Sequence, residues 1–156
     1  MSDNNGFTLI ELVMTLLLIG ILAVYAAPKL DISFFRNTNF FLQAISSIRF
    51  AQKQAIASGC HVEINIALSN CSVSWSNPGD VNCPTDGDAI DNPASGNSNF
   101  CDGSTPSTNP TGGNFRFDSI GRPMDTSNNL LTAAQNIVIG DRTILVEAET
   151  GYTHEN

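Results

Sequence analysis

The sequence predicts an α+β protein in which a long N-terminal helix packs on an antiparallel β-sheet. Three observations support this prediction. An apolar segment covers residues 7–27, apolar residues with helical spacing follow from Phe41, and beyond Gly59 polar and apolar residues alternate in short runs. The chain has 156 residues, which leaves room for one domain beside the apolar segment.

The apolar segment is long enough to cross a membrane. It holds 17 apolar residues among 21, whereas the rest of the chain is rich in Asn, Ser, Thr, Gly and Asp. A helix of this length spans about 30 Å, the thickness of the hydrocarbon layer of a bilayer. This distribution argues against an entirely cytosolic soluble protein.

Four residues interrupt this segment, Thr8, Glu11, Thr15 and Gly20, and of these only Glu11 is ionisable. A charged residue deep in lipid costs roughly 2.5–3.5 kcal/mol, so it usually has a partner or a role. A secretory signal peptide could use Val24 and Ala26 as the small residues before a cut, but the leader MSDNNG lacks the basic residues of such a peptide. A plain membrane anchor explains the length and leaves Glu11 without a role.

The run Gly6-Phe7-Thr8-Leu9-Ile10-Glu11, followed by an apolar helix and Pro28, resembles the class III signal of type IV pilins and type II secretion pseudopilins. The resemblance implies that residues 1–6 are a leader peptide, which a prepilin peptidase removes after Gly6 before it N-methylates Phe7. It also makes 7–28 a transmembrane and assembly helix, with Glu11 and Pro28 at the family's fifth and twenty-second mature positions. The leader departs from the family because it carries no Lys or Arg.

The resemblance also implies partners and a location. The chain is expected in the inner membrane as a single-pass protein with a periplasmic head, and then in a pilus or pseudopilus with other pilins bound through the N-terminal helix. There the carboxylate of Glu11 can pair with the Phe7 amine of a neighbour in a low-dielectric bundle, which selects the axial register. Pro28 lacks a backbone donor and disfavours helical geometry before it, so a kink is expected. No cofactor is expected.

An amphipathic helix is predicted over residues 29–59. From Phe41 the apolar residues recur at spacings of three and four, at Ala44, Ile45, Ile48, Ala51 and Ala55. Arg49 and Lys53 fall on another face, and Gly59 is a suitable C-terminal stop.

A β-rich head is predicted over residues 60–156, because the period of the apolar pattern changes to two. Strands are expected at 61–66 and 71–75, joined by a turn at Ser69-Asn70, and a third at 114–118. A fourth and fifth are expected at 136–140 and 143–149, with a tight turn at 140–142.

A narrower resemblance lies near the C-terminus. Residues 117–123, which include Gly121-Arg122-Pro123, and residues 144–152, which end in Thr150-Gly151-Tyr152, resemble the C-terminal motifs of GspH/FimT-type minor pilins and pseudopilins, those of MSHA-type pili most of all. This resemblance implies the pilin fold, and a low-abundance subunit that helps to start the fibre or lies near its tip.

The loop over residues 76–113 is either a binding surface or a disordered excursion. Of its 38 residues, 31 are Gly, Pro, Ser, Thr, Asn or Asp, and a structureless loop of this length is unusual in a compact domain. Disulfides are expected in the periplasm. The four cysteines allow three connectivities, of which the spacings favour Cys60 with Cys71 and Cys83 with Cys101.

Metal binding and catalysis have weak support. No Cys-x-x-Cys occurs and His61 and His154 are isolated, which disfavours zinc and a catalytic Cys–His pair. Residues 86–92 are rich in oxygen ligands suited to calcium but lack the spacing of an EF-hand loop. No set of nucleophile, base and acid indicates an enzyme.

Charge disfavours nucleic acid as a partner. Residues 60–156 carry twelve acids and three bases, whereas residues 29–58 carry four bases and one acid. The resemblances at the two ends of the chain imply a minor pilin of a type IV pilus. The alternatives are a minor pseudopilin of a type II secretion system, and a tip adhesin that binds through the loop 76–113.

Overall fold

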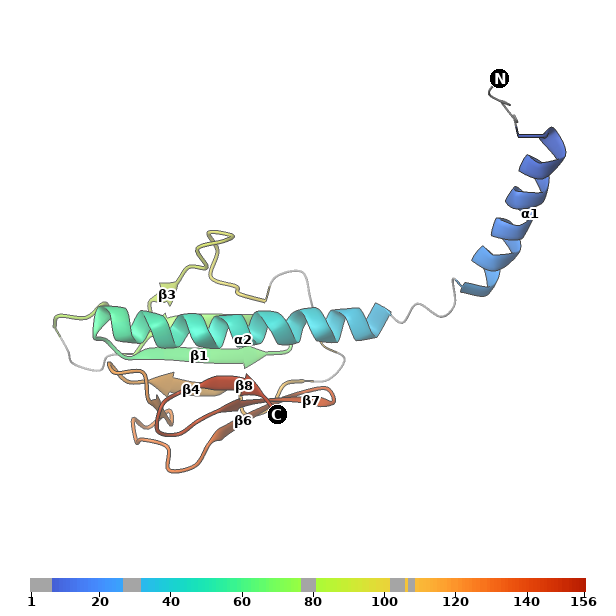
Figure 1. The fold of residues 1–156 in the computed structure, drawn as a ribbon. Coiled ribbons are helices and arrows are strands. Elements are labelled where there is room, and N and C mark those ends of the chain that lie inside the picture. Colours follow the sequence, from blue (N-terminus) through green and yellow to red (C-terminus); the bar gives the residue numbers. More distant parts are fainter. Residues whose placement is uncertain (1–6, 27–31, 77–80, 102–105, 107–108) are drawn as a thin grey trace, which may run out of the picture. The chain divides into compact units, whose positions relative to one another are not determined.

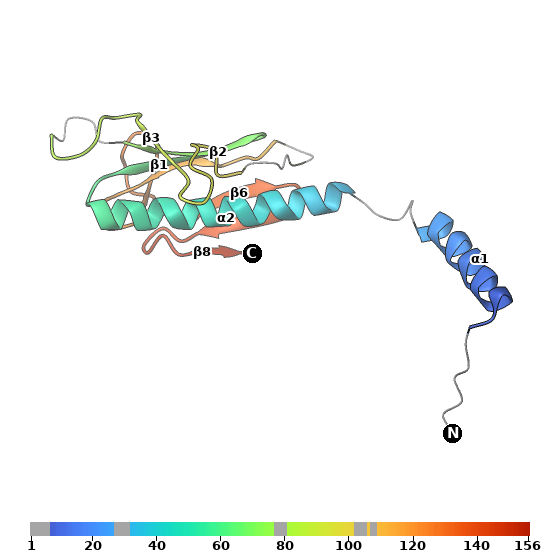
Figure 2. The same cartoon turned by 90° about the horizontal axis from the view of Figure 1, so that it is seen from above.

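The computed structural model describes residues 7–26, 32–76, 81–101, 106 and 109–156. The chain divides into two units, Met1–Ile32 and Ser33–Asn156, and each is described by itself. The first holds helix α1 (Leu9–Ala26), and the second holds nearly all of helix α2 (Ile32–Ser58) and the described strands (Figures 1 and 2). In chain order these are β1 (Val62–Ala67), β2 (Asn70–Trp75), β3 (Ala89–Ile90), β4 (Asn114–Phe117), β5 (Pro123–Met124), β6 (Gln135–Ile139), β7 (Arg142–Val146) and β8 (Thr153–Glu155).

Helix α2 buries one face against the sheets, as its apolar spacing predicts. The side chains without any exposed surface on this face are Phe40, Phe41, Ala44, Ile48, Ala51 and Ala55. Arg49 and Lys53 are exposed, which confirms the predicted polar face. The helix stops at Gly59, whose φ of 71° suits glycine and whose N–H donates to the Ala55 carbonyl at 2.9 Å.

Five strands form an antiparallel sheet in the order β3-β2-β1-β4-β5. β1 is central, since Val62 pairs with Trp75 of β2 on one side and with Phe117 of β4 on the other. Successive residues of a strand point to opposite faces, and Val62, Ile64 and Ile66 are the ones that enter the core. The short strands β3 and β5 close the two edges, which limits the unpaired backbone groups that an edge exposes.

Three further strands form a second antiparallel sheet in the order β6-β7-β8. Ile137, Ile139, Ile144 and Val146 of this sheet join the same core as α2 and the larger sheet. Thr111, which precedes β4, joins Val138 of β6 through a pair of backbone hydrogen bonds of 3.1 Å. In Figure 1, α2 runs lengthwise beside β1, and the strands of the smaller sheet lie below β1.

The predicted fold class is confirmed, because helices are followed by antiparallel sheets. The turn predicted at Ser69-Asn70 is wrong by one residue, since Ala67 pairs with Asn70 and leaves Leu68-Ser69 as the turn. The strand predicted over 143–149 is too long. β7 ends at Val146, and the chain reverses into β8 through a hydrogen bond of 2.8 Å from the Gly151 N–H to the Glu147 carbonyl.

Strands β3, β5 and β8 escape prediction because they have only two or three residues each. So short a run cannot show an alternating pattern. These strands depend on a partner strand that is already in place.

Candidate functional site

Thr8 and Glu11 form a capping box at the start of α1. The Thr8 hydroxyl oxygen accepts a hydrogen bond from the Glu11 N–H at 3.3 Å. In return, Oε2 of Glu11 accepts one from the Thr8 N–H at 3.5 Å and one from the Thr8 hydroxyl at 3.3 Å. This reciprocal pattern satisfies donors that the first turn of a helix leaves unpaired. The Thr-x-x-Glu spacing that signals it is visible in the sequence, and Thr8 was not among the predicted site residues.

The capping box fixes where the carboxylate of Glu11 points. Its Oε2 is folded back to the Thr8 nitrogen, which is bonded directly to the Phe7 carbonyl carbon. The side chain of Phe7 is 82% exposed. The carboxylate of Glu11 and residue Phe7 therefore lie at the same end of the helix, whereas Gly6 and Pro28 lie outside the described residues.

The side chains of residues 9–24 of α1 are all exposed within its unit. Gly20 lies in an apolar depression of about 410 Å³, surrounded by Leu16, Leu17, Ile21 and Val24. A Cβ added to Gly20 would meet no atom within 4 Å. A small residue among large apolar ones lets the backbone of a second helix approach closely. Within the described ranges, no helix combines the length and the apolar character needed to cross a membrane.

The four cysteines form two interleaved disulfides, so the pairing that the spacings favoured is wrong. Cys60 bonds to Cys83 with a Cα–Cα distance of 5.8 Å, and Cys71 bonds to Cys101 with one of 5.1 Å. The hairpin register explains the difference. Cys71 lies opposite Ile66, near the turn, whereas Cys60 precedes β1 at the other end. Six residues of strand separate these ends by about 20 Å, and a disulfide needs Cα atoms within about 7 Å.

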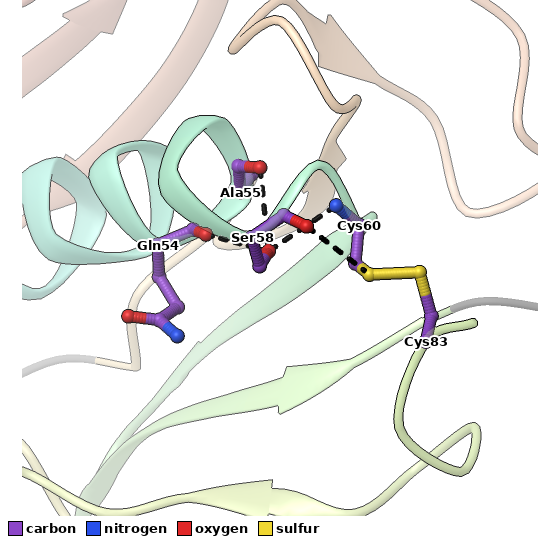
Figure 3. Close-up of a disulfide and its surroundings, with 5 residues drawn as sticks. All are labelled: Gln54, Ala55, Ser58, Cys60 and Cys83. Atoms are coloured by element: carbon purple, nitrogen blue, oxygen red, sulfur yellow. Dashed lines mark hydrogen bonds between the residues drawn. A yellow bond between two sulfur atoms is a disulfide. The ribbon is translucent and has the colours of Figure 1, made fainter.

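The Cys60–Cys83 bond lies at the C-terminal end of α2, as Figure 3 shows. Ser58 holds this end in place. Its hydroxyl donates to the Gln54 carbonyl at 2.7 Å and accepts from the Cys60 N–H at 3.2 Å. The Ser58 hydroxyl thereby links the last turn of α2 to the backbone of Cys60.

Residues 81–101, which we call the lobe, contribute β3 to the outer edge of β2 (Figure 2). Ile90 of β3 pairs with Val73, and the Phe100 N–H donates to the Cys71 carbonyl at 2.8 Å. Phe100 and Cys101 are part of the core. The lobe is therefore a packed extension of the sheet, and a disordered excursion is the wrong description of this part of the loop 76–113.

A groove of about 370 Å³ lies between α2 and the lobe. Its residues are Gln43, Ser46, Ser47, Phe50, Asn92, Pro93, Ala94 and Phe100. The rings of Phe50 and Phe100 lie 5.0 Å apart between their centroids. The lining combines two aromatic rings with amides and hydroxyls and has no charged side chain, which suits a neutral ligand.

The two C-terminal motifs meet each other on α2. Gly121 and Gly151 have φ angles of 87° and 66°, and a Cβ on Gly151 would overlap the Gly121 carbonyl oxygen. Gln52 of α2 donates from Nε2 to the Gly121 carbonyl at 3.0 Å and to the Thr150 carbonyl at 2.8 Å. These motifs therefore hold the turn before β5 and the turn before β8 against the helix.

The acidic residues of the lobe lie in solvent. Asp86, Asp88 and Asp91 are exposed, and the described part of the chain holds no group of three His, Cys, Asp or Glu residues that could bind a metal ion. The four cysteine sulfurs are engaged in disulfides. Nε2 of His154 lies 3.9 Å from Oε1 of Glu147, and the imidazole stacks on the Tyr152 ring with 5.1 Å between the ring centroids.

Two family models match the chain. Residues 1–27 match the prokaryotic N-terminal methylation motif. Residues 43–148, more than half of the chain, match the type II transport protein GspH. The first match contains the capping box, and the second extends from α2 to the end of β7. Neither the curated proteins nor the solved structures contain a significant match.

Proposed function

We propose, on the premise that this chain belongs to the GspH family of type II transport proteins, that it is a minor pilin incorporated by helix packing into a type IV pilus. The two family matches support a minor pilin or pseudopilin, which is a structural protein. The methylation motif implies processing by a prepilin peptidase and assembly with other pilins. The proposal rests on one observation, that this motif and a GspH match occur in the same chain.

The place of the subunit in the fibre is the finer part of the proposal. The ending over residues 150–155 and the turn Gly121-Arg122-Pro123 are most similar to those of MshC, the minor pilin of the MSHA pilus. This resemblance favours a pilus, with a role in fibre initiation or at the tip. A minor pseudopilin of a type II secretion system is the alternative.

We further propose that the peptidase removes residues 1–6 and methylates Phe7, and that residues 7–28 anchor the protein in the inner membrane until assembly. The exposed apolar side chains of α1 support this proposal. The head, residues 60–156, then lies in the periplasm.

Specific contacts must set how neighbouring subunits pack and stagger, because helices in lipid gain little hydrophobic energy by associating. Two features of α1 provide such contacts. The depression around Gly20 admits a neighbouring helix, and the carboxylate of Glu11 can bind the amine that cleavage creates on the Phe7 of another subunit. A subunit with the wrong stagger keeps an unpaired buried charge, which is costly.

Intact-mass measurement of the protein purified from cells tests the processing. The expected mass lacks residues 1–6, includes one added methyl group, and lacks four hydrogens because of the two disulfides. A protein that still begins at Met1, or that is cut near Ala26 and released, would contradict the proposal.

Replacement of Glu11 tests the assembly step. Removing one partner of a buried pair costs about 3–5 kcal/mol, so Glu11→Ala should be cleaved and inserted normally but incorporated at least about tenfold less. The control is Glu149→Ala, which removes an exposed acid of the head. Incorporation of Glu11→Ala at the normal level would contradict this mechanism.

The groove beside the lobe favours a second function, that of a tip-located binding module. Ser46→Trp would fill the groove, whereas Ala57→Trp places the same side chain at an exposed position of α2 outside it. If the groove binds a ligand, only Ser46→Trp should reduce adhesion, and fibre number should stay the same in both. Equal adhesion of the two variants would reject this function.

A further inference from the structure

The disulfides of the head link the first cysteine to the third and the second to the fourth. The native pairs are separated by 23 and 30 residues. Each pair of consecutive cysteines is closer along the chain, with separations of 11, 12 and 18 residues. No native bond therefore joins neighbours in the sequence.

Chain statistics favour the consecutive pairs in an unfolded head. The probability of closing a loop falls roughly as the three-halves power of its length, so Cys60 meets Cys71 about three times as often as it meets Cys83. Order of export adds to this preference. In the proposed topology Cys60 and Cys71 reach the periplasm before Cys83 does.

A head with disulfides between consecutive cysteines cannot adopt the native fold. Cys60 and Cys71 lie at opposite ends of the β1–β2 hairpin, where the His61 carbonyl still accepts the Ser76 N–H at 2.9 Å. Because Cys83 lies beside Cys60 and Cys101 beside Cys71, every consecutive pair spans the length of this hairpin. That length is about 20 Å, far beyond the reach of a disulfide.

We propose that the head first forms consecutive disulfides and reaches its native pairing by exchange with a dithiol disulfide isomerase, which makes such an enzyme a maturation partner of this protein. The inference rests on the proposed periplasmic location of the head, where a disulfide-bearing oxidant makes the first bonds. Its basis is the interleaved connectivity on the two ends of one hairpin.

The exchange conserves electrons. A thiolate of the isomerase attacks one sulfur of a Cys60–Cys71 bond, forms a mixed disulfide with Cys60 and releases Cys71 as a thiolate. Cys71 then attacks the Cys83–Cys101 bond at Cys101, and the released Cys83 thiolate displaces the isomerase from Cys60. Two disulfides are present before and after, and the isomerase regains its thiolate.

Burial limits when the exchange can take place. In the native head the exposed fractions of Cys71 and Cys101 are 0% and 1%, so an isomerase cannot reach their bond. Cys83 is only partly buried. Reshuffling must therefore precede closure of the core.

Disulfide mapping in cells tests the proposal. The full chain is produced in two strains, with and without periplasmic isomerase activity, and both strains keep the oxidant. Free thiols are alkylated, and peptides are mapped by mass spectrometry without reduction. We expect the fraction with native pairing to fall at least about threefold without the isomerase, in line with the loop-closure ratio, and consecutive pairs to replace it.

The matched control is the double variant Cys60→Ser/Cys83→Ser. It keeps only Cys71 and Cys101, which can form no wrong pair within the chain, so its oxidation should not depend on the isomerase. Equal native pairing of the unaltered chain in both strains would overturn the proposal. Four alkylated cysteines in both strains would overturn the periplasmic location as well, and with it the need for this partner.

Refolding in vitro distinguishes a failure of the exchange proposal from a failure of the proposed periplasmic location. The reduced full chain is refolded in detergent micelles in a glutathione buffer and quenched with acid at intervals. Consecutive pairs should dominate the early samples, and added isomerase should speed their conversion. Native pairs in the earliest samples would overturn the inference whatever the location of the head in cells.

Discussion

Glu11 has a partner in its own chain and a proposed partner in a neighbour. The capping box with Thr8 satisfies Glu11 in the isolated helix. A helix cap is worth about 1 kcal/mol, whereas breaking a buried ion pair costs about 3–5 kcal/mol. In a helix bundle the bond to the neighbour's amine should therefore prevail over the cap.

Thr8→Val should separate these two roles, because it removes the capping hydroxyl and keeps Glu11. The first turn of α1 should lose about 0.5–2 kcal/mol, which faster exchange of the Glu11 amide hydrogen would reveal, while incorporation into fibres persists. Thr15→Val is the control, since its hydroxyl donates to the Leu12 carbonyl at 2.9 Å within the helix. Loss of incorporation in Thr8→Val alone would show that the cap itself drives assembly.

Gly151 and Gly59 share a positive φ but differ in their surroundings. A Cβ on Gly151 would overlap Gly121 and Gln52, whereas one on Gly59 would meet nothing within 4 Å. Backbone strain alone costs about 1–2 kcal/mol for alanine in this conformation.

Gly151→Ala should therefore destabilise the head by more than about 2 kcal/mol, and Gly59→Ala by about 1 kcal/mol. Urea unfolding followed by the fluorescence of Trp75, the single tryptophan, measures both. Equal losses would mean that the contact between the two C-terminal motifs contributes nothing.

Strand β8 is held to β7 by an exposed ion pair and to α2 by a side chain. Arg142 of β7 donates to both carboxylate oxygens of Glu155, at 2.7 and 2.8 Å, and its guanidinium carbon lies 3.8 Å from the centroid of the Phe41 ring. Arg49 of α2 donates to the Thr153 carbonyl at 2.9 Å. The hydrogen bond from Arg142 lowers the pKa of Glu155, and the same bond raises the pKa of Arg142.

The lowered pKa of Glu155 gives β8 a pH dependence. A carboxyl with a lowered folded-state pKa stabilises the fold above its ordinary pKa of about 4.3, and this contribution disappears as the pH falls through the lowered value. The Asn156 N–H, which donates to the Thr143 carbonyl at 3.0 Å, should lose protection against hydrogen exchange in that range. Glu155→Gln should abolish this pH-dependent loss of protection at the Asn156 N–H. Glu149→Gln, the control, should retain it.

Among the described residues, the hydrophobic core of the second unit is formed by side chains of that unit. Every member of the core cluster lies between Phe40 and Val146. Because hydrophobic burial is the main stabilising term in folding, the second unit should not need α1 in order to fold.

A chain truncated to residues 33–156 should therefore fold with both disulfides. Its Tm should lie within about 4 °C of the head transition in the full chain, a shift that corresponds to about 1 kcal/mol in a domain of this size. Thermal unfolding followed by circular dichroism measures this value. A truncated chain without a cooperative transition would show that α1 contributes to the stability of the head.

The sequence alone determined the fold class, the amphipathic helix and its stop at Gly59, because these depend on local periodicity and on the backbone preference of one residue. It also singled out Glu11, for which we propose a role in assembly, as an acid in an apolar helix. The tertiary structure alone decided the disulfide pairing, the packed lobe and the contact of Gly121 with Gly151. These features join residues far apart in the chain, and they depend on which strands pair and on where each turn falls, so an error of one residue in a turn changes every pairing that follows from it.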